Sequence, residues 1–121
     1  MAVFKRFEEI KAWQKARELT KHIYQISGGE KFSRNFGLRD QIRRASVSIM
    51  ANIAEGNGRK TNKDFANFLV ISHGSAAEVQ SHLYVALDLG YISQENFTPL
   101  YQQLDEVSKM TMALAQKLLN T

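Results

Sequence analysis

Cysteine is absent from this sequence of 121 residues, and proline occurs only once. Without cysteine the chain has no disulfide bond, no thiolate metal ligand and no cysteine nucleophile. Average usage would give about six prolines, so helices in this chain meet few built-in breaks. Long uninterrupted apolar runs are also missing, since the segment poorest in charge, 65–87, contains Asn67, Gln80, two histidines and several serines. These polar groups argue against a transmembrane helix.

The remaining composition is that of a single globular domain. Hydrophobic residues make up 44% of the chain and charged residues 23%, and the length suits one domain spanning residues 1–121. Acidic residues appear by Glu8 and no apolar core precedes them, unlike in a signal peptide. We therefore expect a cytoplasmic protein.

Apolar residues recur at helical spacing in four segments, and none of the four shows the alternation of a strand. Six of the seven glycines fall where this periodicity stops. The helices are predicted at about 6–27, 38–56, 62–89 and 94–119. Because the loops are short, we expect an all-α, antiparallel, up-down-up-down four-helix bundle.

Local signals help to place two helix starts. Thr61, followed by Asp64, resembles a capping box at the start of the third helix. For the fourth helix, Ser93 is a plausible N-cap, but Thr98-Pro99 fits an N-cap followed by a first helical residue better. A short turn at 94–97 that runs into the main helix would reconcile the two.

The second and third helices differ from the first and fourth, which have one apolar stripe each. Both carry a second apolar row roughly opposite the core face, and a four-helix domain of this size cannot bury two helices on all sides. We therefore predict an oligomer, although such rows also occur half-exposed on monomers. The predicted interface consists of Val47, Met50, Ala54, Val70, Gly74, Ala77, Ser81 and Val85.

A polar stripe accompanies the core face of the second helix. Gln41, Ser48, Asn52 and Glu55 lie within about 60° of one another on a helix of 3.6 residues per turn. Partly buried polar groups need hydrogen-bond partners, so we predict a buried network with Ser72, Ser75 or His82. A ligand pocket is the less favoured alternative.

Recognisable catalytic or metal-binding patterns are missing. Glu78 and His82 share a helix face, but a di-iron bundle needs Glu-x-x-His on two helices, so a structural or interfacial pair is expected. Gly56 to Thr61 resembles the end of a phosphate-binding loop, yet Arg59 replaces its last glycine and no strand precedes it. We predict no enzyme activity, no cofactor and no metal.

Charge is divided unevenly along the chain. Residues 1–63 hold 14 of the 16 basic and 6 of the 12 acidic residues, a net charge of +8, which leaves −4 for residues 64–121. Clustered cations can neutralise nucleic-acid phosphates in a salt-sensitive manner, or they can form salt bridges with the acidic half. Arg43 and Arg44 fit bonds to a neighbouring helix or subunit slightly better than phosphate contacts. The predicted nucleic-acid-binding residues are Arg39, Arg43, Arg44, Arg59, Lys60 and Lys63.

A long central block of the chain, from about Trp13 to Leu118, resembles the four-helix-bundle family of proteins encoded in 23S rRNA intervening sequences. Two departures from the family pattern are Met50 in place of a proline and Ser27-Gly28-Gly29 in place of a Phe-Pro loop start. The resemblance rests on residues 41–49 (QIRRASVSI), 52–56 (NIAEG) and 58–60 (GRK), on Phe65, on Phe68-Leu69, on Gly74-Ser75 and on Glu78.

The resemblance implies an all-α protein that assembles as a homopentamer without established enzymatic activity. Relatives include the accessory variability determinant of diversity-generating retroelements, a basic pentamer that binds nucleic acid and a reverse transcriptase. We therefore expect a non-enzymatic, ring-like homo-oligomer that contacts RNA or DNA phosphates through its basic first half. The alternative is a protein–protein scaffold or adaptor with no role in nucleic-acid binding.

Overall fold

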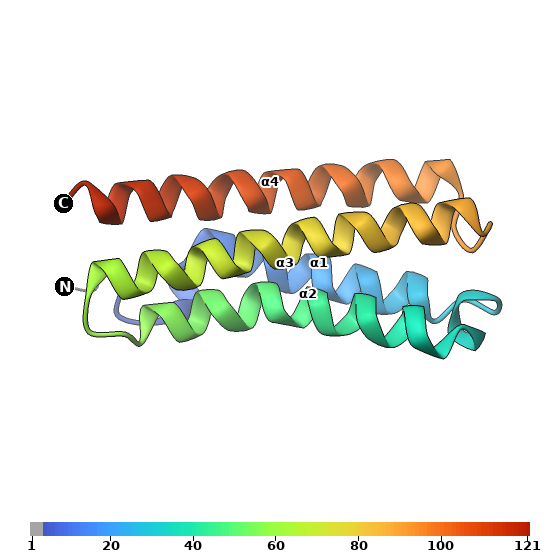
Figure 1. The fold of residues 1–121 in the computed structure, drawn as a ribbon, viewed down its shortest axis with the longest axis horizontal. Helices are drawn as coiled ribbons and strands as arrows, with labels where there is room; N and C mark the ends of the chain where they lie inside the picture. Colours follow the sequence, from blue (N-terminus) through green and yellow to red (C-terminus); the bar gives the residue numbers. More distant parts are fainter. Residues whose placement is uncertain (1–3) are drawn as a thin grey trace.

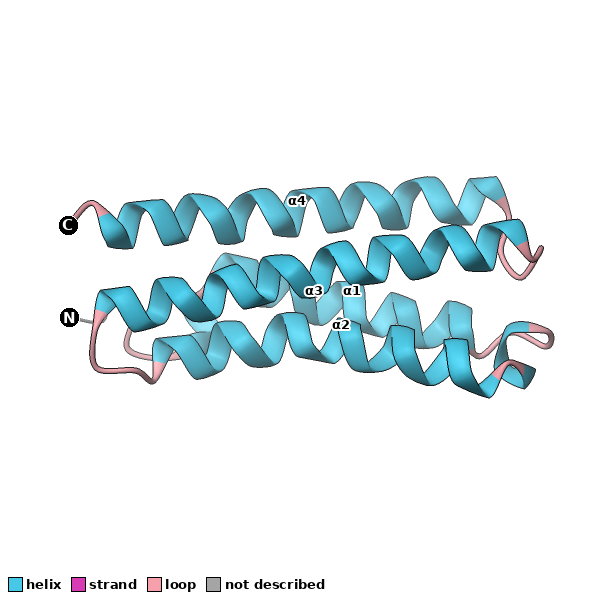
Figure 2. Cartoon of the chain, viewed as in Figure 1, coloured by secondary structure: helices cyan, strands magenta, loops and turns pink. Residues whose placement is uncertain are grey.

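The computed structural model describes residues 4–121. These residues form four long α-helices and no β-strand (Figure 2). The helices lie side by side along the long axis of the molecule (Figure 1). The loops that follow α1 and α3 lie at one end, and the loop that follows α2 lies at the other, near the C-terminus. The bounds are α1 Lys11–Ser27, α2 Phe36–Asn57, α3 Asn62–Asp88 and α4 Gln94–Leu119, with short 3₁₀ turns η1 Phe7–Glu9 and η2 Phe32–Arg34.

A single apolar core runs between the helices. α1 contacts α2 and α4, and α3 contacts the same two helices, most extensively. Burial of each large aliphatic side chain contributes about 1.5–3 kcal/mol, so the core stripes predicted from helical spacing account for how the four helices are held together. The largest side chains with almost no exposed surface are Phe32, Ile10, Leu19, Ile23, Ile42, Ile49, Ile53, Leu69, Leu83, Leu104, Leu118 and Val79.

Side-chain caps fix the starts of three helices. The oxygens of Asn35, Thr61 and Ser93 each accept a backbone N–H bond of 3.1 Å from three residues further along the chain. The predicted cap at Thr61 is thus confirmed, whereas the preference for Thr98-Pro99 is wrong, because α4 is continuous from Gln94. Pro99 is accommodated near the helix start, where only the bond to the carbonyl of Glu95 is lost.

The first helix begins later than predicted, at Lys11 rather than near residue 6. Ile10 is in an extended conformation and almost completely buried, with an exposed fraction of 1%. Phe7 packs edge-on against Trp13, with their ring centres 5.0 Å apart. The burial of Ile10 and the contact between Phe7 and Trp13 cover the end of the core. These contacts favour the 3₁₀ turn η1 over a further turn of α1. The second helix begins slightly earlier than predicted, at Phe36.

Two glycines serve distinct structural purposes. Gly56 lies inside α2, and a Cβ atom there would come within 2.8 Å of both Phe65 and Phe68 of α3. The absence of a side chain therefore allows α2 and α3 to approach closely near their connecting loop. Gly90, with φ of +75°, ends α3 in a left-handed conformation that the N–H groups of Gly90 and Tyr91 complete by bonding preceding carbonyls.

Candidate nucleic-acid interface

Three of the predicted phosphate-binding residues cluster around the loop between α2 and α3. Lys60 and Lys63 are exposed, and neither forms an ion pair with any residue between 4 and 121. Arg59 lies 4.6 Å from the ring centre of Phe68, and its Nη2 is 3.9 Å from Glu55 Oε2. An exposed pair at that distance contributes little to stability. All three cations are therefore accessible to a polyanion.

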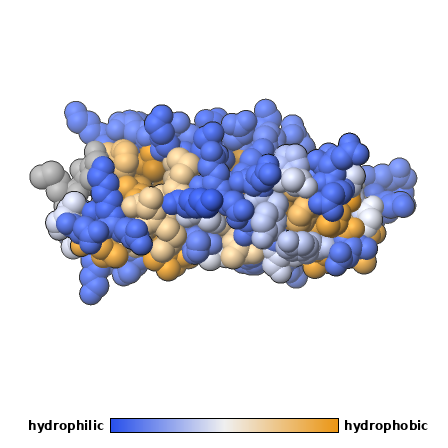
Figure 3. Space-filling view, turned by 90° about the horizontal axis from the view of Figure 1, so that it is seen from above, coloured by the Kyte–Doolittle hydropathy of each residue, from blue (hydrophilic) through white to orange (hydrophobic). Residues whose placement is uncertain are grey.

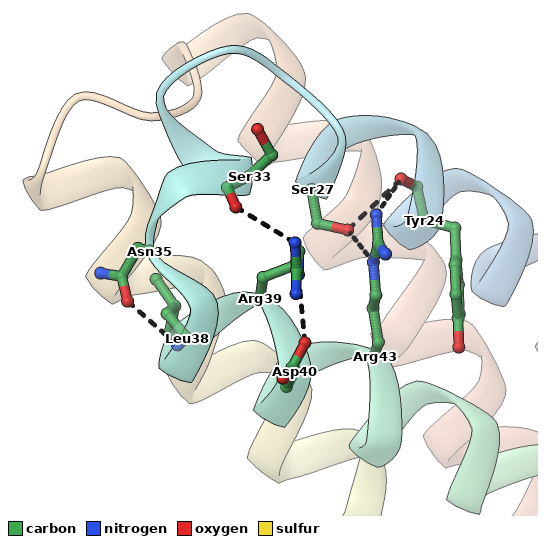
Figure 4. Close-up of polar contacts among 8 residues, drawn as sticks. All are labelled: Tyr24, Ser27, Ser33, Asn35, Leu38, Arg39, Asp40 and Arg43. Carbon is green, nitrogen blue, oxygen red and sulfur yellow. Dashed lines mark hydrogen bonds and ion pairs between the residues drawn. The ribbon is translucent and has the colours of Figure 1, made fainter.

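The three arginines near the other end of α2 have different environments. The guanidinium of Arg43 lies over the ring of Tyr24 at 4.6 Å. Its Nε donates a 2.7 Å hydrogen bond to Ser27 Oγ, and its Nη2 donates one of 3.2 Å to the Tyr24 carbonyl (Figure 4). Arg43 thus ties α2 to the last turn of α1 within its own chain.

Arg39 is also engaged, whereas Arg44 is free. Nε of Arg39 lies 3.0 Å from Asp40 Oδ1, and its Nη1 donates a 3.2 Å bond to the Ser33 carbonyl (Figure 4). Arg44 is exposed and makes no hydrogen bond or ion pair with the described part of the chain. α2 ends at Asn57, and at 1.5 Å per residue Arg43 lies about 21 Å before that end, so the six residues form two separate clusters.

The basic half of the chain is not neutralised by the acidic half. Among residues 4–121, the pair between Lys15 Nζ and Glu106 Oε1 at 3.5 Å is the one ion pair that joins the two halves across position 63 with a lysine or arginine. The other lysine and arginine pairs lie within the first half. Most of the cations of the first half therefore face solvent.

The predicted interface residues occupy two rows in the single chain. On α3, Val70, Gly74, Ala77, Ser81 and Val85 are all exposed. A Cβ atom added to Gly74 would meet no atom within 4 Å. On α2, Val47 is exposed, whereas Met50 is half-buried against the core and Ala54 is half-buried.

These two rows lie on different sides of α2. Met50 and Ala54 fall within about 20° of Arg43 on the helix, and Arg43 bonds to α1. Ser48, which bonds to Ser75 of α3 at 3.0 Å, lies about 140° from Arg43. The α2 row therefore lies on the side of α2 that is nearer α1. The α3 row lies past the other side of α2, the side that contacts α3.

Three exposed apolar residues were not predicted from the sequence. Ile71 and Tyr84 extend the α3 row, with exposed fractions of 50% and 49%. Phe36, at the start of α2, is 64% exposed. Their signal in the sequence is weak, because a single apolar residue beside a periodic stripe does not reveal whether a neighbouring helix covers it.

Seen from the α4 side, hydrophobic atoms gather toward each end of the molecule among hydrophilic ones (Figure 3).

The predicted polar network is smaller than expected. Asn52 Nδ2 donates to the carbonyl and to Oγ of Ser48 at 2.8 and 2.9 Å, and Ser48 Oγ lies 3.0 Å from Ser75 Oγ. Gln41 and Glu55 are exposed instead and do not belong to the network. Long side chains carry their polar ends to water, whereas serine and asparagine hold theirs close to the backbone, between the helices.

The expected pair of Glu78 and His82 is present, with Oε2 and Nε2 3.4 Å apart. Within residues 4–121, no group of three or more histidine, aspartate or glutamate side chains is placed to hold a metal ion. None of the helices in this range combines the length and apolar character needed to cross a membrane.

Comparison with known proteins places the chain in a family. The model of the 23S rRNA-intervening sequence protein family matches residues 8–113. The chain belongs to this family. A solved structure with a TM-score of 0.80 and 26% identity covers 87% of this chain and 98% of its own. That structure is a protein of unknown function from the S23 ribosomal protein family of Bacteroides thetaiotaomicron.

The search of curated proteins gave no match. The family resemblance seen in the sequence is thus confirmed. Neither the family's description nor that of the solved structure names a catalytic activity.

Proposed function

We propose that this protein is a non-enzymatic, oligomeric binding module that contacts the phosphates of RNA or DNA through its basic first half. The observation that carries this proposal is the lack of internal neutralisation. The first half has a net charge of +8, and a single exposed lysine–glutamate pair joins it to the acidic half among the described residues. Such a surface attracts polyanions without reading their sequence.

The oligomer that we propose is a ring of antiparallel bundles, with five subunits as the family resemblance implies. Two separate apolar rows support a cyclic arrangement. In a two-fold dimer the same surface of each subunit meets itself, whereas in a ring one surface of a subunit meets a different surface of the next. The row on α3 and the row at the α1 edge of α2 provide two such surfaces.

Binding to a labelled structured RNA, measured by fluorescence anisotropy over a series of salt concentrations, tests the phosphate contacts. We expect binding at low salt and a linear decrease of log K with log salt, with a slope of about −0.7 to −0.9 per phosphate contacted. No binding at low salt, or binding that salt does not weaken, would contradict the proposal.

Charge reversal locates the contacts. In the variant K60E/K63E we expect affinity to fall at least tenfold and the salt slope to become shallower, because two phosphate contacts become repulsive. The matched control is K109E/K117E on the outer face of α4, where we expect a smaller decrease. Light scattering on both variants checks that the assembly is intact.

A protein–protein scaffold is the second candidate, and the exposed apolar row on α3 favours it. In that case K60E/K63E and the unmodified protein would bind RNA equally weakly, and both would keep their assembly. The anisotropy experiment therefore distinguishes the two functions.

A further inference from the structure

Phe36 is the most exposed large apolar side chain in the described part of the molecule, at 64%. It lies at the start of α2, at the end of the bundle where α1 and α2 are connected (Figure 1). The surrounding segment contains the cations Lys31, Arg34 and Arg39. An exposed aromatic ring among cations is a combination that protein stability alone does not require.

The backbone that carries Phe36 is firmly anchored. Asn35 Oδ1 accepts the N–H of Leu38 at 3.1 Å, and Asn35 Nδ2 donates to the hydroxyl of Tyr91 at 3.2 Å. The Tyr91 ring packs against the completely buried Phe32, with ring centres 5.5 Å apart. The ring of Phe36 is thus presented to solvent from a fixed position, so a ligand that stacks on it would have little backbone to order.

Arg39 lies over one face of the Phe36 ring, with its guanidinium carbon 4.9 Å from the ring centre, so the opposite face is the one left for a ligand to stack on. The bonds to Asp40 and to the Ser33 carbonyl hold this guanidinium in place (Figure 4). One turn further along α2, Arg43 lies over Tyr24, whose exposed fraction is 43%. α2 therefore carries an exposed ring and two fixed guanidinium groups on its side facing α1, and α1 adds a second exposed ring, that of Tyr24.

Unpaired nucleobases stack on aromatic rings and on the planes of arginine guanidinium groups, which are the groups found here. In a duplex the base faces are already stacked on one another. The preceding loop provides cations for the backbone. Lys31 is exposed, and Arg34 has only an exposed pair with Glu30 at 3.4 Å, which phosphate can replace at little cost.

We propose that Phe36 and Arg39 form a stacking site for an unpaired base of single-stranded RNA or DNA, with Lys31 and Arg34 contacting the neighbouring phosphates. This inference rests on the nucleic-acid function proposed above and adds to it a preference for single strands.

The test compares a labelled single-stranded RNA with the same strand in a duplex and with a strand of equal length that carries abasic sites. We expect the unmodified protein to bind the base-bearing strand about tenfold more tightly than the abasic strand. In Phe36→Ala this ratio should fall to about one, whereas Phe36→Trp should keep it. The matched control is Leu119→Ala, which removes another exposed side chain (58%) and should leave the ratio unchanged.

A second readout reports stacking directly. A strand that contains 2-aminopurine should lose fluorescence on binding the unmodified protein, and this quenching should disappear in Phe36→Ala. The same strand made as DNA shows whether the 2′-hydroxyl matters to the site. Because Phe36 is exposed, circular dichroism should show the variant folded.

The outcomes separate this inference from the proposed function. If the protein binds RNA but Phe36→Ala keeps the preference for base-bearing strands, the stacking site is wrong and the phosphate contacts stand. If Phe36→Ala changes the mass of the assembly and not the preference, Phe36 contacts another subunit and the inference is overturned. Absence of any nucleic-acid binding would overturn both.

Discussion

The pair of α1 and α4 differs from the pair of α2 and α3 in what it presents to solvent. Each of the first two has one apolar stripe and an outer face of charged and amide side chains. Of the nine large apolar side chains exposed among residues 4–121, six lie on α2 and α3, one each on α1 and α4, and the ninth, Leu89, directly follows α3. In the single chain, the other helices cover nearly all of the apolar surface of α1 and α4, whereas α2 and α3 leave apolar surface exposed to solvent.

The largest expected effect comes from placing a charge on this unpartnered surface. In Ala77→Arg on α3, an arginine at the proposed subunit contact would lack a partner, and we expect a cost on the order of 3 kcal/mol or more per interface. The oligomer should dissociate, as measured by light scattering. The matched variant Ala113→Arg, also at an exposed alanine but on α4, should assemble normally. Intact Ala77→Arg oligomers would show that the α3 row is not an interface.

The glycines of α2 and α3 provide the next comparison. Gly56→Ala would force apart two helices that meet at this residue, because the added Cβ would lie 2.8 Å from Phe65 and Phe68. We expect a loss of about 1–3 kcal/mol in the free energy of unfolding, measured with urea at fixed protein concentration.

Gly74→Ala serves as the control for this substitution. A Cβ atom at Gly74 would meet no other atom in the single chain. Replacing a glycine by alanine inside a helix stabilises the folded state by about 0.5–1 kcal/mol. The isolated chain should therefore become more stable. If Gly56→Ala is also stabilising, the close contact between α2 and α3 is wrong.

Arg43 and Arg44 are adjacent in sequence but should have different roles. We expect Arg43 to stabilise the fold and Arg44 to contribute to RNA binding. Arg43→Ala removes the hydrogen bonds to Ser27 and Tyr24, and we expect a loss of about 1 kcal/mol in stability. Arg44→Ala should change stability by less than about 0.5 kcal/mol and weaken RNA binding. Thermal unfolding and anisotropy on both variants measure the difference, and equal effects on stability would contradict it.

The smallest effect is expected at the ion pair of Arg6 and Glu8, near the start of α1. The hydrogen bond and charge of Arg6 lower the pKa of the Glu8 carboxyl below its ordinary value of 4.5. The stability that this pair contributes is thus present above that value and is lost as the pH falls through the lowered pKa. In Arg6→Ala the pKa should rise toward 4.5, as followed by NMR titration. An unchanged pKa would show that Arg6 is not the cause.

Helical spacing was sufficient to predict the four helices and the core. The Thr61 cap could also be predicted, because Thr61 followed by Asp64 resembles a capping box. The start of α1 could not, because the extended conformation of Ile10 follows from its burial on the end of the core. Gln41 and Glu55 occupy the same sector of α2 as Ser48 and Asn52, and side-chain length decides which reach water. The exposure of Phe36 depends on where the neighbouring loop runs, which no local pattern encodes.

The close contact at Gly56 also bears on the order in which the chain folds. α2 and α3 are joined by a short loop, and they approach closely beside it at Gly56. Closing a short loop costs little entropy, and contacts between neighbours in sequence form fastest. We expect this hairpin to form first and to act as the template onto which α1 and α4 dock. Gly56→Ala should accordingly slow refolding more than it accelerates unfolding.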